Sequence, residues 1–336
     1  MSAPSDPLPL PDFLEARRSA MRLDLSFGQH GGTHAEWRDA LERCWRAGLP
    51  PCEGLPDGEV TGDAVRLRFA TGAVAEGCLV RPPGAGPHPA VLLLHDHGGA
   101  FEIGWRKLFD LDEARAGQAR HYGGRAPASA FLNAGLAVLC LDAPGWGGRR
   151  AGDYDGQQAL AANALGLGWS LAGLTAGEDV QAAAWLAAQP GIDAARIGAF
   201  GFSFGGFRAW QVAALTPHVR APASLSWMAG RAALMRPGAP LLKGQSAFHF
   251  LHPGVTARAD FPDLAGLAAG KALFFRSGRG DRHMPEDAVT AAWTRIAEIC
   301  AAAGAPAPDT ALHDHAHTCP PETLDEAVAF LRRSLT

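Results

Sequence analysis

Short apolar runs alternate with longer stretches of helical pattern along most of the chain. Five of the apolar runs predict strands buried on both faces of a sheet, at 90–94, 136–141, 196–202, 223–227 and 272–275. Stretches that predict helices lie between and after these runs, at 177–189, 204–215, 286–303 and 321–335. Strands that alternate with helices in this way predict one α/β domain with a mostly parallel central sheet flanked by helices.

The N-terminal part of the chain has a different pattern. Residues 1–32 are rich in proline and glycine and predict an extended arm. The stretch 33–36, Thr-His-Ala-Glu, resembles a capping box and predicts the start of a helix. This helix should end near residue 48 and carry three apolar side chains, Trp37, Leu41 and Trp45. Two β-like runs follow, 60–70 and 74–82, and the Thr-Gly between them predicts a hairpin.

These patterns divide the chain into an N-terminal arm with its helix, 1–58, and one α/β domain, 59–336. Two long connections inside the domain, about 147–172 and 229–270, interrupt the alternation of strands and helices. In open α/β sheets, ligands bind at the edge where the parallel strands end. We therefore expect both connections to lie near the functional site.

Composition narrows the classes of function. The chain has 336 residues, 47% of them hydrophobic, and a formal net charge of −4, without a basic stripe for nucleic acid or a polybasic patch for a membrane. Its first residues lack the features of a secretion signal, and no run approaches the roughly 20 apolar residues of a membrane span. The six cysteines form no C-x-x-C pair, which favours reduced thiols. We therefore expect a cytoplasmic protein that acts on a small molecule, with self-association left open.

The segment Gly201-Phe202-Ser203-Phe204-Gly205 is a G-x-S-x-G motif between a predicted strand and a predicted helix. That context is typical of a nucleophile elbow, in which a serine is exposed on a strained turn. Its glycines leave room where the strand and the helix nearly touch. We predict Ser203 as a nucleophile.

A serine hydroxyl needs a base to take its proton and an acid to orient that base, and after an elbow the chain order is serine, acid, histidine. Asp281 follows the apolar run 272–275 in a glycine-rich turn and is the predicted acid, with Asp263 and Glu286 as weaker candidates. Near the C-terminus three histidines compete for the role of base. We prefer His317 because it lies directly before the last helix, while the other candidates are His313 and His315.

Two backbone N–H groups are needed to hold the oxyanion that forms during acyl transfer. One should belong to Phe204, the residue after the nucleophile. The other should come from the loop after the run 90–94, where we prefer His97, with Gly98 close behind. Trp146, which follows another predicted strand, is the best candidate for a wall of the substrate pocket.

Two other classes of function compete with this interpretation. His95, His97 and the histidines of 313–317 could bind a metal ion and support a metal-dependent hydrolase. No H-x-x-x-H helix pair accompanies them, however, and a serine nucleophile needs no metal. The chain could also be a binding module on the same fold. The ordered set of nucleophile, acid and base argues against that alternative.

Ser203 in its segment Gly-Phe-Ser-Phe-Gly-Gly, Asp281 and His317 resemble the α/β-hydrolase superfamily. Four stretches carry a closer resemblance to one branch of it: residues 94–99, the segment 179–197, the group His252 to Asp263, and the segment 278–285 with His317. Within it the chain looks like the dienelactone hydrolase and acetyl xylan esterase branch, although Ser203 stands where dienelactone hydrolases carry cysteine. The resemblance implies the α/β-hydrolase fold and a Ser-His-Asp esterase that cleaves small acyl esters, often of acetylated sugars, without a cofactor or a metal. An amidase or peptidase with the same three residues is the alternative among serine enzymes.

Overall fold

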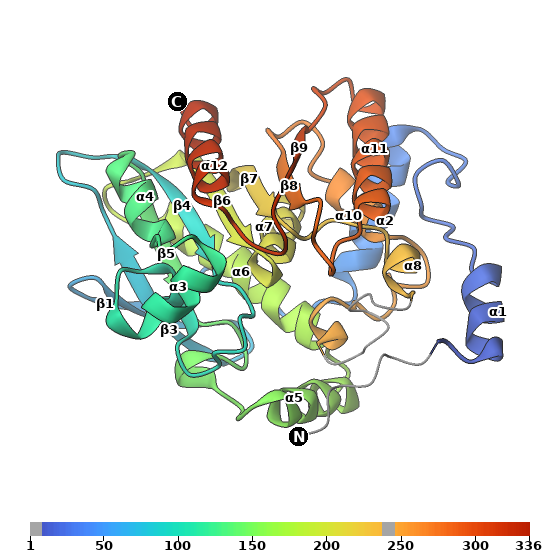
Figure 1. Cartoon of the computed structure of the whole chain (residues 1–336), viewed down its shortest axis with the longest axis horizontal. Helices are drawn as coiled ribbons and strands as arrows, with labels where there is room; N and C mark the ends of the chain where they lie inside the picture. The colour runs from blue at the N-terminus through green and yellow to red at the C-terminus, as the bar shows by residue number, and fades with distance from the viewer. Residues whose placement is uncertain (1–8, 237–245) are drawn as a thin grey trace.

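A computed structural model describes residues 9–236 and 246–336 of the chain (Figure 1). A nine-stranded mixed sheet forms the centre of these residues, in the order β1-β2-β3-β5-β4-β6-β7-β8-β9. Neighbours from β5 to β9 in this order are parallel, while β1, β2 and β3 are antiparallel to their neighbours. The predicted α/β domain with a mostly parallel sheet is therefore confirmed.

The five apolar runs and the two N-terminal β-like runs all contribute strands. The strands are β1 (Asp57–Thr61), β2 (Ala64–Arg68), β3 (Val74–Val80), β4 (His88–Leu94), β5 (Ala137–Leu141), β6 (Ile192–Phe202), β7 (Val219–Leu225), β8 (Phe274–Gly278) and β9 (Asp309–His313). The helices are α1 (Asp12–Ala20), α2 (His34–Arg46), α3 (Arg115–His121), α4 (Pro127–Asn133), α5 (Tyr154–Gly166), α6 (Leu171–Ala187), α7 (Phe204–Leu215), α8 (Arg231–Leu234), α10 (Phe261–Gly266), α11 (Glu286–Ala302) and α12 (Pro321–Ser334), with short 3₁₀ turns between them.

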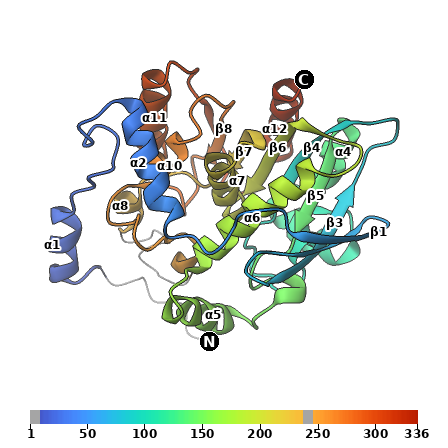
Figure 2. The same ribbon diagram turned by 180° about the vertical axis from the view of Figure 1, so that it is seen from behind.

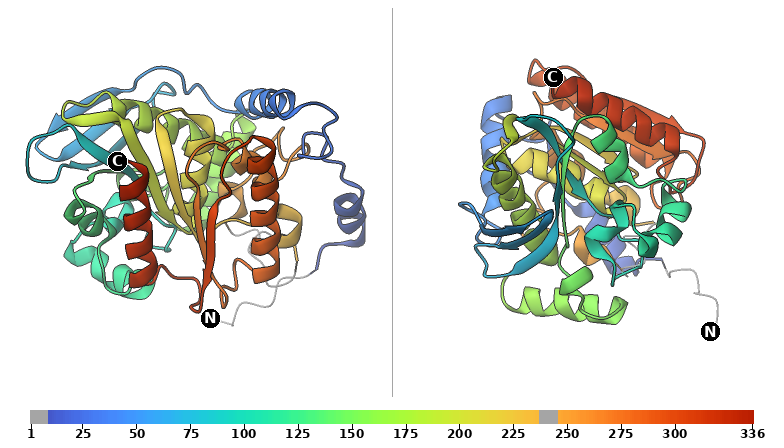
Figure 3. Two further views of the ribbon diagram at one scale, coloured as in Figure 1. Left: turned by 90° about the horizontal axis from the view of Figure 1, so that it is seen from above. Right: turned by 90° about the vertical axis from the view of Figure 1, so that its left-hand side faces the viewer.

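Helices cover both faces of the sheet. One apolar core contains side chains of α2, α6, α7, α10 and α11, and the other contains side chains of α4 and α12. Viewed from behind, α6 runs across the front of the sheet and α2 lies beside it, next to α10 (Figure 2). The end-on view places α12 and α2 on opposite sides of it (Figure 3). The parallel strands are therefore buried on both faces, which explains their uninterrupted apolar sequences.

The predicted helix after residue 33 is present as α2. Thr33 caps it in a full capping box with Glu36, and Trp37, Leu41 and Trp45 are each at most 1% exposed. Their burial in the same core as α6 and α7 joins the N-terminal part to the sheet. The division of the chain at residue 58 stays a prediction.

Two local expectations need correction, and one helix was not predicted. The arm 1–32 is not wholly extended, because α1 forms where Asp12 and Glu15 occupy its first turn and arginines its last turn, an arrangement that suits the helix dipole. The run 60–70 is not one strand, since Gly62, at φ 61°, turns the chain between β1 and β2. The connection 147–172 contains α5, which Asp153 caps.

Parts of two predicted segments, residues 1–8 of the arm and 237–245 of the second connection, lie outside the described residues. Among the helices of 9–236 and 246–336, none alone has the length and apolar character needed to cross a membrane. The pair α5 and α6 satisfies these criteria only when taken together, and it is bent by 87°.

Candidate active site

Ser203 lies at the tip of a sharp turn between β6 and α7. Its backbone has φ 56° and ψ −122°, a region that is strained for a residue with a side chain, and its N–H donates to the carbonyl of Leu225 at 2.9 Å. A Cβ atom on Gly205 would lie 1.9 Å from the carbonyl oxygen of Leu94, and one on Gly201 would lie 2.1 Å from the backbone of Gly205. The two glycines of the motif are therefore required by close backbone packing.

The structure brings Ser203, His317 and Asp281 into one hydrogen-bonded series. His317 Nε2 is 2.8 Å from Ser203 Oγ, and His317 Nδ1 is 2.6 Å from Asp281 Oδ2. The three residues come from the ends of different elements, because Ser203 follows β6, Asp281 follows β8 and His317 lies between β9 and α12. Parallel strands bring these ends to one edge of the sheet.

Asp281 is buried and held by its neighbours as well as by His317. Its Oδ1 accepts the backbone N–H groups of His283 at 2.8 Å and Met284 at 3.2 Å. Burial by itself raises the pKa of this carboxyl, but the hydrogen bond with His317, the charge of that ring and the N–H of His283 outweigh burial and lower the pKa. Asp281 therefore remains an anion that can orient an imidazole.

The competing candidates have other partners. His315 is exposed and pairs with Glu322 at 2.8 Å. The ring of His313 accepts a long hydrogen bond, 3.4 Å, from the N–H of His315. Asp263 accepts the N–H of Asp260 at 3.0 Å at the start of α10, and Glu286 pairs with Arg279 at 2.8 Å. None of the four is hydrogen-bonded to Ser203 in the described structure.

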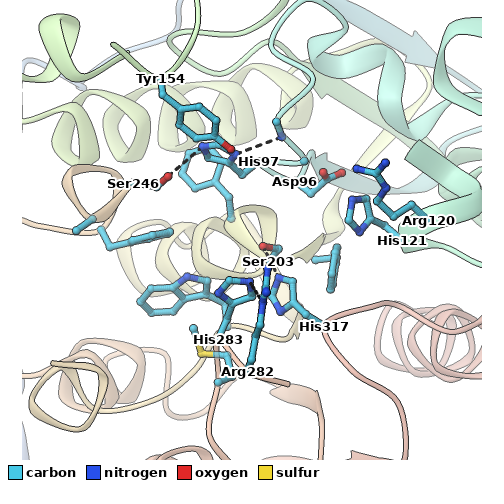
Figure 4. Close-up of a pocket in the computed structure, with 18 residues that line it drawn as sticks. Asp96, His97, Arg120, His121, Tyr154, Ser203, Ser246, Arg282, His283 and His317 are labelled. Atoms are coloured by element: carbon cyan, nitrogen blue, oxygen red, sulfur yellow. Dashed lines mark hydrogen bonds between the residues drawn. The ribbon is translucent and has the colours of Figure 1, made fainter. Parts of the chain in front are cut away.

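Ser203 opens into a cavity of about 430 Å³ (Figure 4). His97 and Phe204, the predicted oxyanion residues, both line it. The N–H of Phe204 belongs to the first turn of α7, where a helix offers no acceptor. The remaining lining is mixed, with polar side chains of Asp96, Arg120, His121, Tyr154, Ser246, Arg282 and His283 and apolar side chains of Phe202, Trp227, Ala247, Phe250 and Met284.

The His97 ring closes one side of this cavity. It stacks on Tyr154 with the ring centroids 5.5 Å apart, and its Nε2 lies 3.3 Å from Ser246 Oγ. Burial, followed by the nearby charge of Lys107, lowers the pKa of His97 to about 4. The ring is therefore neutral near pH 7.

Trp146 does not line the cavity, which corrects the expectation that it forms a pocket wall. Its side chain is 0% exposed and stacks behind Phe204, with the centroids 5.2 Å apart. Its indole N–H donates to the carbonyl of His97 at 3.2 Å. Trp146 therefore supports two residues of the cavity from behind.

Sequence reasoning missed several residues of the cavity. Arg282 and His283 directly follow Asp281, so proximity in sequence to the predicted acid could have indicated them. Tyr154 belongs to the connection 147–172, and Ser246 to the connection 229–270, both of which were expected near the site. Arg120 and His121, on α3, had no signal of this kind.

The histidines considered as metal ligands have hydrogen-bond or ion-pair partners of their own. His95 is fully buried; its Nε2 accepts the N–H of Ala143 at 3.1 Å and its Nδ1 lies 2.9 Å from the carbonyl oxygen of Asp96. Within residues 9–236 and 246–336, no group of three or more His, Cys, Asp or Glu side chains is placed to hold a metal ion. The described geometry therefore gives the metal hypothesis no support.

Comparisons with known proteins give distant likenesses, and no family model matches the chain. The protein YtaP of Bacillus subtilis (strain 168), whose name marks it as a proposed hydrolase, is 23% identical over 220 residues, which cover 66% of this chain and 69% of YtaP.

Three solved structures are similar over nearly the whole chain. A glucuronoyl esterase of Solibacter usitatus has a TM-score of 0.68 at 16% identity, covering 96% of this chain and 100% of its own. A proposed acetyl xylan esterase of Bacteroides fragilis has a TM-score of 0.65 at 17% identity, covering 94% and 84%. A glucuronoyl esterase of Teredinibacter turnerae has a TM-score of 0.63 at 16% identity, covering 100% and 94%. At these identities the likeness concerns the fold.

Proposed function

Because the chain has the α/β-hydrolase fold, we propose that it is a serine hydrolase that cleaves small carboxylic esters through an acyl-enzyme. The observation that carries this proposal is the series Ser203, His317 and Asp281, with contacts of 2.8 Å and 2.6 Å at the edge of a cavity. A buried carboxylate, an imidazole and a strained serine in this geometry match the requirements of nucleophilic catalysis.

In the proposed reaction Ser203 Oγ attacks the ester carbonyl while His317 Nε2 takes the hydroxyl proton. Asp281 holds Nδ1–H and stabilises the imidazolium that forms. The tetrahedral intermediate collapses when the C–O bond to the alcohol breaks and His317 returns the proton to the leaving oxygen. Water then attacks the acyl-enzyme by the same proton transfers, which releases the acid and restores Ser203.

The negative oxygen of the intermediate needs donors on the side of Ser203 that faces the cavity. We assign this role to the backbone N–H groups of Phe204 and His97, whose residues both line the cavity. Phe204 is held from behind by Trp146, and the His97 ring is held by Tyr154. Donors fixed in this way cost little reorganisation when the charge develops.

A cavity of about 430 Å³ is of the size that takes a small ester or one sugar unit. The names of the similar structures, acetyl xylan esterase and glucuronoyl esterase, favour esters of carbohydrates as the first substrates to test. An amidase with the same residues is the second candidate, because the geometry of the three residues is the same for both reactions.

The proposal is tested with 4-nitrophenyl acetate and with the matching 4-nitroanilide. We expect the ester to be hydrolysed far faster than the anilide, fluorophosphonate to label Ser203, and Ser203→Ala to lower kcat by about 10⁴-fold. Chelators should leave the rate unchanged. A wild-type protein that hydrolyses neither compound and resists fluorophosphonate would contradict the serine mechanism, and a rate lost to chelators would favour the metal alternative.

A further inference from the structure

Lys107 is a buried lysine whose charge the proposed triad does not use. It lies in a 3₁₀ turn, Gly104–Leu108, and is only 7% exposed. No carboxylate forms an ion pair with it among the described residues. Taking an ammonium group out of water is costly without a counter-charge, so its burial calls for specific compensating contacts.

The ammonium group of Lys107 donates instead to two consecutive backbone carbonyls. Its Nζ lies 3.0 Å from the oxygen of Asp96 and 2.7 Å from the oxygen of His97, and it sits 5.6 Å from the centre of the Trp146 ring. Gln118 fixes the backbone that carries Lys107 by donating to its carbonyl at 3.1 Å. Lys107 thus holds the loop that follows β4.

The two carbonyls belong to the peptide groups that carry the N–H of His97, a proposed oxyanion donor, and the N–H of Gly98, the other candidate donor of this loop. The carbonyl of Asp96 shares a peptide plane with the N–H of His97, and the carbonyl of His97 shares one with the N–H of Gly98. In a trans peptide the N–H points opposite to the C=O. A cation bound to both carbonyls therefore directs both N–H groups away from itself, and neither N–H has an acceptor within residues 9–236 and 246–336.

The same contacts strengthen the donors. A cation on a carbonyl polarises the peptide group, so the N–H at its other end becomes a better hydrogen-bond donor. The buried positive charge also lies one peptide group away from the place where the oxyanion would form.

We propose that Lys107 is a positioning residue of the oxyanion hole, which orients and polarises the N–H groups of His97 and Gly98 through their peptide carbonyls. This inference rests on the proposed function, because it concerns the transition state of the same reaction. It assigns no contact between Lys107 and substrate.

Lys271 provides a matched control. Its Nζ also donates to two backbone carbonyls, those of Ala213 at 2.7 Å and Thr216 at 2.6 Å, at the C-terminal end of α7. Lys107→Met and Lys271→Met therefore remove the same kind of contact, one beside the oxyanion loop and one at the far end of the helix that begins with Phe204.

The test measures kcat, KM and the affinity of a trifluoromethyl ketone, which forms a tetrahedral adduct with a reactive serine. We expect Lys107→Met to lower kcat and the ketone affinity by about 10²-fold while KM changes little, as for loss of one oxyanion donor. Lys271→Met should lower the melting temperature without changing either quantity. If Lys107→Met does not fold, Lys107→Gln keeps a donor without the charge and should show an intermediate loss.

Equal kcat and equal ketone affinity in the wild type and the Lys107 variants would overturn this inference. That failure is distinguishable from failure of the proposed function, in which the wild-type protein itself would lack esterase activity and fluorophosphonate labelling.

A second, independent observation concerns the charge of the cavity. Arg120 on α3 and Arg282 after β8 both line it, and neither forms an ion pair within the described residues. Their neighbours along the chain do, since Arg115 pairs with Asp112, Arg125 with Asp325 and Arg279 with Glu286. Arg282 Nε donates to His283 Nε2 at 3.3 Å, so the two arginines at the cavity lack a carboxylate partner among the described residues, in a protein of net charge −4.

The acidic groups near the cavity are already engaged. Asp96 accepts the hydroxyl of Tyr122 at 2.9 Å, and Asp281 accepts from His317. Arg120 and Arg282 reach the cavity from separate elements around Ser203 (Figure 4). A guanidinium group matches a carboxylate with two parallel hydrogen bonds.

The geometry points to ester substrates that carry a carboxylate away from the bond that is cleaved. This inference also rests on the proposed function. Two matched pairs of esters test it, with the charge on either side of the bond: mono(4-nitrophenyl) glutarate against its methyl ester, and 4-acetoxybenzoate against its methyl ester.

The readout is the ratio of kcat/KM for the charged and the neutral ester, in which differences of intrinsic reactivity cancel between variants. We expect Arg120→Gln or Arg282→Gln to lower this ratio about fivefold for at least one pair of esters, which corresponds to about 1 kcal/mol at a partly exposed ion pair. High salt should reduce the difference, because it screens the charges. Arg43→Gln, on the exposed side of α2, should leave the ratio unchanged. A ratio that is the same in all variants for both pairs would overturn the inference, while neutral esters would still be hydrolysed.

Discussion

At the scale of single residues, the histidines near the C-terminus differ in what each ring contacts. His317 bonds both Ser203 and Asp281, whereas His315 bonds Glu322, an exposed residue in the first turn of α12. The alternation of side chains along an extended segment does not separate them, because residues two apart share a face. Their partners therefore decide which ring can move a proton.

We expect His317→Ala to lower kcat by about 10⁴-fold, since the general base is lost, and His313→Ala and His315→Ala to change it by less than about tenfold. Initial rates on 4-nitrophenyl acetate, with circular dichroism to show that each variant is folded, provide the measurement. A folded His315→Ala protein as inactive as Ser203→Ala would overturn the assignment of the base.

At the scale of elements, α6 and α7 are joined by a buried ion pair beneath the elbow. Arg208 of α7 donates to both carboxylate oxygens of Asp179 in α6, at 2.9 Å and 2.7 Å, and the two side chains are 3% and 6% exposed. The guanidinium group also lies 5.3 Å from the centre of the Phe204 ring. The pair therefore fixes the helix that carries Phe204.

Removing one partner should be costly because the other charge stays buried. We expect Asp179→Asn to lower the free energy of unfolding by about 3–5 kcal/mol in urea titrations. Asp287→Asn, which breaks an exposed pair with Arg236, is the control and should lower the free energy of unfolding far less, because water screens exposed charges. Equal losses in the two variants would show that the α6–α7 pair has no special importance for stability.

At the scale of the whole molecule, several buried histidines make the fold sensitive to acid. Burial lowers the pKa of four imidazoles, to about 4 for His97, to about 3 for His252 and well below the ordinary value for His95 and His249. Below pH 6.5 the unfolded chain binds protons on these rings and the folded protein does not. Stability is therefore unaffected by them above pH 6.5 and falls as the pH drops below that value.

Each such histidine should remove about 1.4 kcal/mol of stability per pH unit between pH 6.5 and its folded pKa. We expect the melting temperature to fall steadily from pH 6.5 to pH 4.5. His252→Gln should make this fall shallower, and His315→Gln, at an exposed position, should not. A pH dependence that is unchanged in His252→Gln would contradict this origin of acid sensitivity.

The sequence alone predicted the framework. The buried strands were visible as uninterrupted apolar runs, because a parallel sheet covered on both faces admits few polar residues. The turn at Ser203 was visible because its close contacts with Leu94 and Leu225 exclude side chains at the neighbouring glycines. The chain order of serine, acid and histidine narrowed the choice, and two positions completed it: Asp281 follows an apolar run, and His317 lies directly before the last helix. The structure brings these three residues into hydrogen-bonding contact.

Only the tertiary structure decided what surrounds Ser203. Trp146 was expected in the pocket, yet it packs behind Phe204, because the direction of a side chain after a strand depends on elements far away in sequence. Lys107 and Arg120 carry no local motif. Lys107 contacts two carbonyls of the loop after β4, and Arg120 faces an open cavity. Both surroundings form only when distant segments pack together. Local patterns determine backbone form, whereas burial and charge at a site depend on contacts between distant segments.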